Sequence, residues 1–378
     1  MKIGFDAKRA LHNLRGLGNY SRTLIKSLDE YYDENEYYLF SPESKNSELI
    51  EWSKSLGSNF STISPEGFLE RTFPSIWRSL LLKNEINKCH LDIYHGLSHE
   101  LPIGIDNTNT LKVVTIHDLL YLKFPQFFSY IDRQTYHRKF SYSCKNSDIV
   151  IAICEQTKSD IVKYLKVPEE KIHVVYQSCS PDFYYDKSAE ELTRVKKKYG
   201  LENSFIFHIA TMEENKNTLG IVKAFEKVHK DIEEDLILIG RGKKYKQDVI
   251  NYISEANLNN RVRILDEAEN VDIPAIYQLA KLFVFPSFYE GFGIPIIEAL
   301  FSKTPVITSK GGCFPESGGP SSRYVDPYSI EDISNAMVDI LKDTSLQKEM
   351  AQKGHEFVQK FHWRNTSNEL MNLYLTHL

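Results

Sequence analysis

Two glutamates on either side of a glycine-rich turn are the residues of this chain best suited to chemistry. Glu290 and Glu298 lie in the stretch "KLFVFPSFYEGFGIPIIEALFSKTPVITS", residues 281–309. The run "KLFVFPS" predicts a buried strand, and Pro295 fits the first turn of a helix that continues through "IIEALFS". Glycines between them allow positive φ and a close approach of ligand to backbone, which we expect of Gly291 and Gly293.

A strand, a glycine turn and a helix in this order predict an anion site. The free N–H groups of the first helical turn bind phosphate, helped by the helix dipole. Glu298, about one turn into the helix, could accept hydrogen bonds from a sugar diol such as a ribose, and Glu290 could do so for a second sugar. The alternative is that Glu298 only stabilises the helix N-terminus and Glu290 is solvated.

Two cations follow other expected strands of the second half. Lys216, in "EENKNTLGI", could neutralise a diphosphate as charge develops on a leaving group. Arg241, in "LILIGRGKKYK", could hold a phosphate with its planar guanidinium. The alternative in both cases is an ordinary surface cation.

The first half of the chain contains weaker candidates for ligand contact. Gly16 and Gly18, in "LRGLGNYSRTLI", could bring backbone close to a phosphate, although G-x-G-N-Y lacks the third glycine of a dinucleotide fingerprint and also fits a plain helix start. His117 ends the strand-like run "KVVTIHD". It could point to a ligand, or His117 and Asp118 could simply begin a helix through capping by the aspartate.

The elements that must position these residues form an α/β pattern. Short apolar, β-branched runs alternate with helical-period segments twice along the chain, which predicts two doubly wound parallel sheets. The break is expected within residues 177–204. Because ligands bind beyond the carboxyl ends of parallel strands, two facing sheets would form a central cleft. A final amphipathic helix is expected, capped by Asn365 or Thr366, with Leu370, Leu373 and Tyr374 on its apolar side.

Length, net charge and cysteine spacing argue against several classes of function. A length of 378 residues favours two domains, and a net charge of −5 argues against a nucleic-acid binder. The five cysteines form no C-x-x-C pair, which argues against structural zinc and fits a reducing compartment. The N-terminus does not read as a signal peptide, and the chain has no apolar run near the roughly 20 residues needed to cross a bilayer. We expect a cytoplasmic location, and peripheral contact with the inner face of a membrane stays open.

The motif "PSFYEGFGIPIIEAL" resembles the E-x7-E signature of the retaining glycosyltransferases of family 4. Further pieces that resemble this family run nearly end to end in family order: "MKIGFDAKRALHNLRGLGNYSRTLIKSL", "VVTIHDLLYLKFP", "HIATMEENKNTLGIVKAF", "AIYQLAKLFVFPS" and "FPESGG…YVDPYSIEDISNAM". The resemblance is strongest to a mannosyltransferase-like branch of bacterial surface-polysaccharide enzymes. It implies the GT-B fold, in which two Rossmann-like domains face each other.

The resemblance also implies roles for matching residues. The second motif glutamate, Glu298, would hold the nucleotide ribose, and Glu290 would contact donor-sugar hydroxyls. His117 would lie beside the donor sugar and the reacting carbon. A diphosphate would be cradled by backbone at Gly291, Phe292, Gly293 and Ile294. The family usually has an arginine shortly before the lysine that matches Lys216; this chain has Asn215 there, and whether Arg241 replaces it stays open.

The domains implied are residues 1–185 on the acceptor side, residues 186–360 for nucleotide-sugar binding, and a C-terminal helix, residues 361–378, that could pack back on the first domain. Backbone near residues 265–272 would grip the nucleobase. Residues 121–142, rich in aromatic and basic side chains, are expected to pack on their own domain, with one face available to a saccharide or a membrane.

We therefore expect a metal-independent, retaining hexosyltransferase, with mannose favoured, acting from a GDP- or UDP-sugar on a saccharide or lipid-linked saccharide. No D-x-D triplet occurs, and neither cofactor, metal nor nucleic acid is expected. Two alternatives stay open: a nucleotide-sugar epimerase or hydrolase on the same fold, and a catalytically degenerate nucleotide-binding partner subunit.

Overall fold

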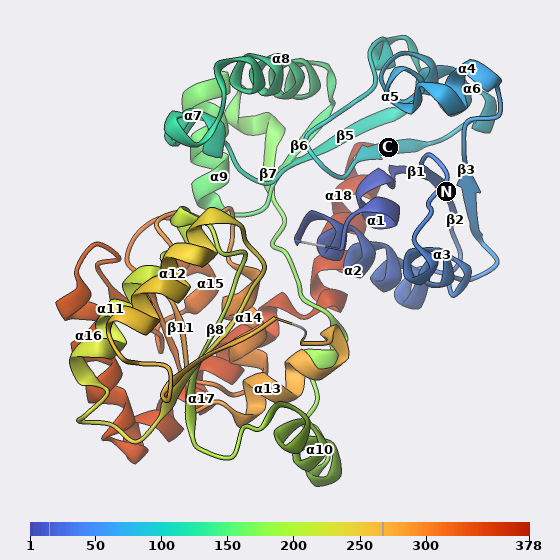
Figure 1. Ribbon diagram of the computed structural model, residues 1–378. Coiled ribbons are helices and arrows are strands. Elements are labelled where there is room, and N and C mark those ends of the chain that lie inside the picture. The colour runs from blue at the N-terminus through green and yellow to red at the C-terminus, as the bar shows by residue number, and fades with distance from the viewer. Residues whose placement is uncertain (15, 267) are drawn as a thin grey trace. The chain divides into compact units, whose positions relative to one another are not determined.

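The computed structural model describes residues 1–14, 16–266 and 268–378, without the side chain of Leu69. The chain divides into two compact units (Figure 1). Unit 1 comprises Met1–Cys179 and Phe361–Leu378, and unit 2 comprises Ser180–Lys360. The chain therefore passes between the units twice, and its last segment belongs to the unit in which it began.

Unit 1 contains a parallel seven-stranded sheet in the order β3-β2-β1-β4-β5-β6-β7. Its strands are β1 (Lys2–Asp6), β2 (Glu36–Phe40), β3 (Phe60–Ile63), β4 (Ile93–Gly96), β5 (Leu111–Ile116), β6 (Ile149–Ala152) and β7 (Ile172–Val174). Central strands such as β4 and β6 are buried at every position, as expected of a sheet covered on both faces.

Helices cover both faces of this sheet, and two separate apolar clusters result. The helices of unit 1 are α1 (Lys8–His12), α2 (Gly16–Tyr31), α3 (Ser47–Lys54), α4 (Phe68–Thr72), α5 (Pro74–Ile76), α6 (Leu82–Cys89), α7 (Leu120–Lys123), α8 (Tyr130–Asn146), α9 (Glu155–Asp160) and α18 (Trp363–His377). Within residues 121–142, α8 buries Phe140 and leaves Tyr130 and Ile131 exposed.

The C-terminal helix α18 packs against α2 in unit 1. Leu370 and Tyr374 are buried there, and Leu373 is partly buried against the same core. The expected cap at Asn365 or Thr366 is wrong: His362 precedes the helix, and its Nδ1 accepts the backbone N–H of Arg364 at 3.3 Å. Thr366 instead lies inside the helix, where its hydroxyl donates to the carbonyl of Tyr176 at 3.2 Å.

Unit 2 contains a parallel six-stranded sheet in the order β10-β9-β8-β11-β12-β13. The strands are β8 (Phe205–Ile209), β9 (Asp235–Ile239), β10 (Val262–Leu265), β11 (Leu282–Phe285), β12 (Val306–Ser309) and β13 (Arg323–Val325). Its helices are α10 (Ala189–Tyr199), α11 (Thr218–Val228), α12 (Lys244–Glu255), α13 (Ile273–Leu279), α14 (Ile294–Phe301), α15 (Phe314–Gly318), α16 (Ile330–Leu341) and α17 (Thr344–Val358). Both units are thus Rossmann-like.

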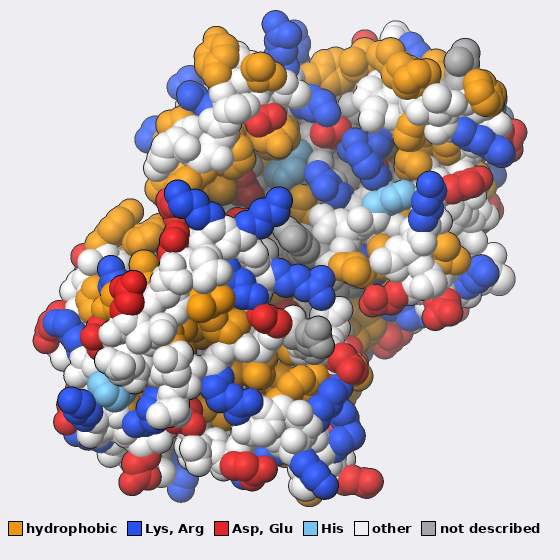
Figure 2. Space-filling model, in the orientation of Figure 1, with side chains coloured by type: hydrophobic (Ala, Val, Ile, Leu, Met, Phe, Trp, Pro, Cys, Tyr) orange, Lys and Arg blue, Asp and Glu red, His pale blue; other side chains and the backbone are white. Residues whose placement is uncertain are grey.

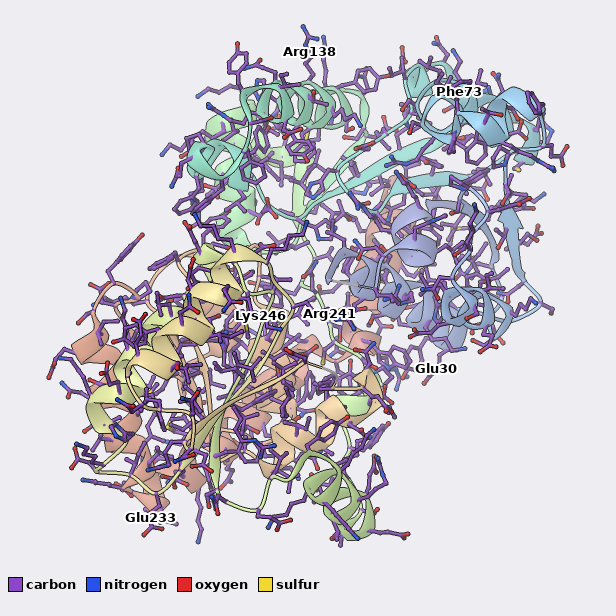
Figure 3. All side chains as sticks on the ribbon, in the orientation of Figure 1. Glu30, Phe73, Arg138, Glu233, Arg241 and Lys246 are labelled. Atoms are coloured by element: carbon purple, nitrogen blue, oxygen red, sulfur yellow. The ribbon has the colours of Figure 1, made fainter. Side chains whose placement is uncertain are left out.

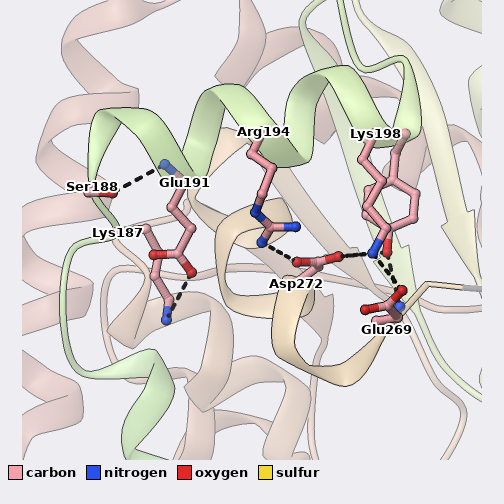
Figure 4. Close-up of polar contacts among 8 residues, drawn as sticks. Lys187, Ser188, Glu191, Arg194, Lys198, Glu269 and Asp272 are labelled. Carbon is pink, nitrogen blue, oxygen red and sulfur yellow. Dashed lines mark hydrogen bonds and ion pairs between the residues drawn. The ribbon is translucent and has the colours of Figure 1, made fainter.

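One buried carboxylate of unit 2 accepts three hydrogen bonds from helix α10 (Figure 4). Asp272 is fully buried and accepts from Arg194 at 2.5 Å, from Lys198 at 2.7 Å and from the Tyr199 hydroxyl at 2.8 Å. The pKa of Asp272 falls to about 2, because these hydrogen bonds and the Arg194 charge outweigh the opposing effect of burial.

Candidate active site

The loops that follow β8 and β11 meet because these two strands are neighbours in the sheet of unit 2. Lys216, in the short helical turn Glu214–Lys216, donates from Nζ to both carboxylate oxygens of Glu290, at 2.7 and 2.8 Å. The two side chains are 18% and 13% exposed. The backbone N–H of Phe288 donates to the carbonyl of Asn215 at 2.9 Å, which joins the two loops. The two residues predicted separately from sequence therefore form one ion pair.

A helix begins directly after this pair. α14 starts at Ile294 with Pro295 in its first turn, as predicted. Gly293 precedes it with φ +97°, a conformation that side chains rarely adopt. Positive φ was also expected at Gly291, and this was wrong, because Gly291 is not among the glycines with positive φ. Phe292 is buried. The turn thus needs the positive φ of Gly293, and its carbonyl accepts the backbone N–H of Ile296 at 2.9 Å.

Glu298 lies partly buried on α14, one turn into the helix. The hydroxyl of Tyr277, on α13, donates to its Oε2 at 3.1 Å. Burial of this carboxyl raises its pKa to about 7, and the Tyr277 hydrogen bond only partly offsets that effect. An acid with this pKa changes its ionisation near neutrality and is stabilised as the anion by any further donor. A sugar diol is one such donor.

Arg241 follows β9 and is exposed at the same end of unit 2 as Lys246 (Figure 3). Within the described part of the chain it forms no ion pair, whereas Lys246 is paired with Asp266. Gly240 is needed for packing, because a Cβ there would lie 2.0 Å from the Ala210 carbonyl oxygen. Among the described residues Arg241 is therefore an unpaired cation at the carboxyl edge of the sheet, and no hydrogen bond or ion pair there joins it to Lys216.

His117 follows β5 in unit 1 and is buried with both ring nitrogens engaged. Its Nε2 donates to the carbonyl of Leu97 at 2.8 Å, and its Nδ1 accepts from the Gln177 amide at 2.8 Å. The ring packs edge-on against Tyr20, with centroids 4.7 Å apart. Burial lowers the pKa of His117 to about 3, so the ring is neutral. These contacts suit a positioning role better than proton transfer.

The glycines of the first half act mainly inside unit 1. Gly16 is the first residue of α2. A Cβ on Gly18 would lie 1.7 Å from the Asn13 carbonyl oxygen, so this glycine lets α2 pack against the end of α1. Tyr20, two residues on, contacts His117. The described contacts of Gly18 are thus to protein backbone.

Three residues that sequence reasoning missed support the site. Tyr277 fixes Glu298, Gln177 fixes His117, and His99 packs edge-on against His117 with ring centroids 5.1 Å apart. Tyr277 and Gln177 lie far along the chain from the residues they contact. The run "YHGLSHELP", which begins within β4, could have drawn attention to His99, because it places a histidine just beyond a strand's carboxyl end.

No group of three or more His, Cys, Asp or Glu side chains that could hold a metal occurs in the described residues. In the same residues no helix is long and apolar enough to cross a membrane. The stretch 265–272, expected to grip a nucleobase, includes Glu267, which lies outside the described residues.

Comparison with known proteins places both halves of the chain among glycosyltransferases. Residues 14–183 match the family model "Glycosyltransferase Family 4", and residues 190–357 match "Glycosyl transferases group 1". Together the two models span nearly the whole chain. The protein is a glycosyltransferase with the GT-B type of fold, and it belongs to family 4.

Two of the relatives are O-antigen chain mannosyltransferases. The chain is 29% identical to O-antigen chain mannosyltransferase B of Escherichia coli over 99% of both chains. It is 27% identical to O-antigen chain mannosyltransferase RfbU of Salmonella typhimurium, over 64% of this chain and 63% of that one. Among solved structures, Anabaena Alr3699/HepE in complex with UDP and glucose aligns over 100% of both chains with a TM-score of 0.78 and 20% identity, which supports the fold alone.

Proposed function

We propose that this enzyme transfers a hexose, with mannose favoured, from a nucleoside-diphosphate sugar to a hydroxyl of a saccharide or lipid-linked saccharide in glycan biosynthesis. The Lys216–Glu290 ion pair, next to the glycine turn that leads into α14, carries this proposal. A diphosphate held by the backbone of this turn would add a second anion beside Lys216. The mannosyltransferase relatives supply the sugar class, and whether the base is guanine or uracil is left to the nucleotide test below.

In this proposal each site residue of unit 2 has a defined role. Backbone at Gly291, Phe292, Gly293 and Ile294 holds the diphosphate, Glu298 accepts hydrogen bonds from the ribose diol, and Glu290 contacts donor-sugar hydroxyls. Lys216 and Arg241 stabilise negative charge on the leaving diphosphate, which is where charge grows during transfer. From unit 1 the proposal adds the backbone at Gly16 and Gly18 as contacts of the donor phosphate, and His117 as a contact of the donor sugar beside the reacting carbon. No step needs a metal, because cations and a helix N-terminus supply the positive charge.

The reaction proposed is a front-face displacement with retention of configuration. The bond between the anomeric carbon and the diphosphate oxygen breaks, and the acceptor oxygen forms a bond to the same face of that carbon. The acceptor hydroxyl proton passes to the leaving diphosphate. Protein groups hold the geometry and stabilise charge.

A radiolabelled donor tests this function. GDP-mannose and UDP-glucose, each labelled in the sugar, are incubated with the enzyme, EDTA and a panel of saccharide acceptors. Transfer predicts label in a lengthened saccharide with the anomeric configuration of the donor, undiminished by EDTA. Label in free sugar or in an epimerised donor would support a hydrolase or epimerase instead. Nucleotide binding without turnover on any acceptor would support a degenerate partner subunit.

A further inference from the structure

The carboxyl edge of β1 and β4, in unit 1, carries a group of cations that the proposed donor site does not use. β1 and β4 are parallel neighbours, so the loops that follow them lie side by side. Lys8 and Arg9 follow β1, and His99 and Glu100 follow β4. Figure 2 shows Lys and Arg side chains around a recess of this unit in which a histidine is visible.

The two carboxylates of this edge are already neutralised. Arg78 contacts Asp6 at 2.8 Å and Glu100 at 3.0 Å, and Lys139 contacts Glu100 at 3.1 Å. Arg78 is largely buried, with a side chain 13% exposed. The third carboxylate nearby, Asp118, accepts the backbone N–H of Leu120 at 2.9 Å.

Lys8 and Arg9 are left as excess positive charge. Neither side chain forms an ion pair within the part of the chain that the structure describes, and Arg9 is exposed while Lys8 is half-buried. Arg78 lies close to Lys8, because both contact Asp6: Arg78 through its guanidinium at 2.8 Å and Lys8 through its backbone N–H at 3.3 Å. The pKa of Lys8 is lowered, first by burial and then by the charges of Arg78 and Arg9, while Asp6 and Glu100 act in the opposite direction. Two cations without a carboxylate partner, next to a third, favour the binding of an anion.

His99 supplies a directed hydrogen-bond donor beside these cations. Its backbone has φ +68°, an unusual conformation for a residue with a side chain and one that recurs where ligands are held. The ring stacks on Phe140 with centroids 4.3 Å apart and an interplanar angle of 4°. Its Nδ1 accepts the backbone N–H of His117 at 3.4 Å. In the neutral ring the proton is therefore on Nε2, for which no partner is found in the described residues.

His99 stays neutral at physiological pH. Burial lowers its pKa to about 3, and the nearby positive charge of Arg9 adds to this effect. The side chain therefore presents an uncharged N–H next to the two unpaired cations. An N–H and two cations suit a group with several anionic oxygens, such as a phosphate ester.

We propose that Lys8, Arg9 and His99 form a subsite for a phosphate or diphosphate group on the acceptor saccharide. The proposal rests on the proposed function in taking unit 1 as the acceptor side. It goes further by assigning the acceptor to an anionic class and by naming the residues that select it.

Nuclear magnetic resonance on the full-length chain tests the subsite directly. The protein is labelled at its histidine side chains, and the His99 signal is assigned with the His99→Gln variant. The donor site is first filled with whichever nucleoside diphosphate stabilises the protein, so that added anions report on unit 1. Benzyl phosphate is then titrated, with benzyl alcohol as the neutral match.

Benzyl phosphate should shift the His99 signal saturably, and benzyl alcohol should not. Lys8→Ala and Arg9→Ala should each weaken the binding about tenfold or more, since each removes a charged contact. Lys54→Ala, an exposed lysine of α3 on the same unit, serves as the matched control and should bind as the parent does. Rising salt should weaken binding in the parent and less in the two variants.

The proposal is overturned if benzyl phosphate leaves the His99 signal unchanged, or if Lys8→Ala and Arg9→Ala bind it as tightly as the parent. A further arm measures co-sedimentation with phosphatidylglycerol vesicles. Loss of vesicle binding in these variants, with no response of His99 to benzyl phosphate, would make the patch a membrane contact and contradict an acceptor subsite. If a nucleotide still stabilises the protein when the subsite test fails, the proposed transferase function stands. Failure of the subsite can therefore be distinguished from failure of the proposed function.

Discussion

Lys216 donates to both oxygens of Glu290 across the gap between two neighbouring strand-end loops, at 2.7 and 2.8 Å. Each residue therefore holds the other before any donor is present. In the proposed function, a diphosphate competes with Glu290 for Lys216, and a sugar hydroxyl competes with Lys216 for Glu290. Donor binding then rearranges this pair.

Replacing Lys216 should impair sugar transfer. Lys216→Ala removes a charged hydrogen bond of about 1.5–3 kcal/mol and leaves Glu290 unpaired, so kcat/KM should fall about tenfold to a hundredfold. Lys216→Arg should recover part of the loss. Steady-state kinetics with GDP-mannose or UDP-glucose measure both variants, and Lys223→Ala on α11 is the matched control. Full activity of Lys216→Ala would remove this residue from the site.

Nucleotide affinity should depend on pH through Glu298. The pKa of this carboxyl is about 7 in the folded protein, above its ordinary value of 4.5. A ribose diol donates to the ionised form, so nucleoside-diphosphate binding should tighten from pH 6 to pH 8. Calorimetric titration checks this, and in Glu298→Gln the affinity should be weaker and flatter across that range. If nucleotide affinity changed with pH in the same way in both proteins, this would contradict a hydrogen bond from the ribose diol to Glu298.

The same raised pKa predicts that the free energy of unfolding falls with rising pH, whereas nucleotide affinity rises. Between pH 4.5 and about 7 the folded protein binds more protons at Glu298 than the unfolded chain does. The contribution of this group therefore favours folding at low pH and is lost as pH rises through 7. The Tm of the ligand-free protein should fall less over this pH range in Glu298→Gln than in the parent. Identical declines would mean that the carboxyl is not shifted.

His117 should be a neutral ring with its proton on Nε2. The Leu97 carbonyl accepts from Nε2 and the Gln177 amide donates to Nδ1, which together select this tautomer. Nitrogen NMR of labelled histidine should show it unchanged from pH 5 to pH 8. In Gln177→Glu a carboxylate would face Nδ1 and should favour the charged ring, so His117 should titrate at higher pH. A parent ring that titrates near 6.5 would contradict the described contacts.

Asp272 should matter for stability and little for chemistry. Asp272→Asn weakens three hydrogen bonds to α10 and should destabilise unit 2 by about 1–3 kcal/mol. Glu349→Gln, which breaks an exposed pair with Lys353, should cost well under 1 kcal/mol. Thermal melting compares them. Because the pKa of Asp272 is depressed to about 2, its stabilising effect should be lost as pH falls from about 4 to 2.

Much of the fold was predictable because it rests on local pattern. Alternating apolar runs and helices predicted two parallel sheets, and Pro295 marked the start of α14. Local signals were less reliable at single residues. Gly293 takes positive φ whereas Gly291 does not, and His362 rather than Asn365 caps α18. Turn and cap geometry depends on neighbouring loops, which sequence spacing does not specify.

The site's supporting contacts were the least predictable part. Gln177 reaches His117 from 60 residues along the chain, and Tyr277 reaches Glu298 from 21. Tyrosine and glutamine are common, and only tertiary packing selects these particular ones. The Lys216–Glu290 pair likewise joins residues 74 apart, although each was a candidate by itself. Motif residues could therefore be predicted, while the residues that fix their geometry could not.

Thermal melting with UDP, GDP, ADP, CDP and dTDP, on the parent and on Glu298→Ala, tests the central claim most directly. A nucleotide at 100 times its Kd should stabilise the parent by about 2.7 kcal/mol, a Tm rise of about 5–10 °C for a unit of this size. The account predicts that one base produces this rise in the parent and little or none in Glu298→Ala. No rise with any of the five nucleotides, or an equal rise in both proteins, would contradict a nucleotide-sugar site at Glu298.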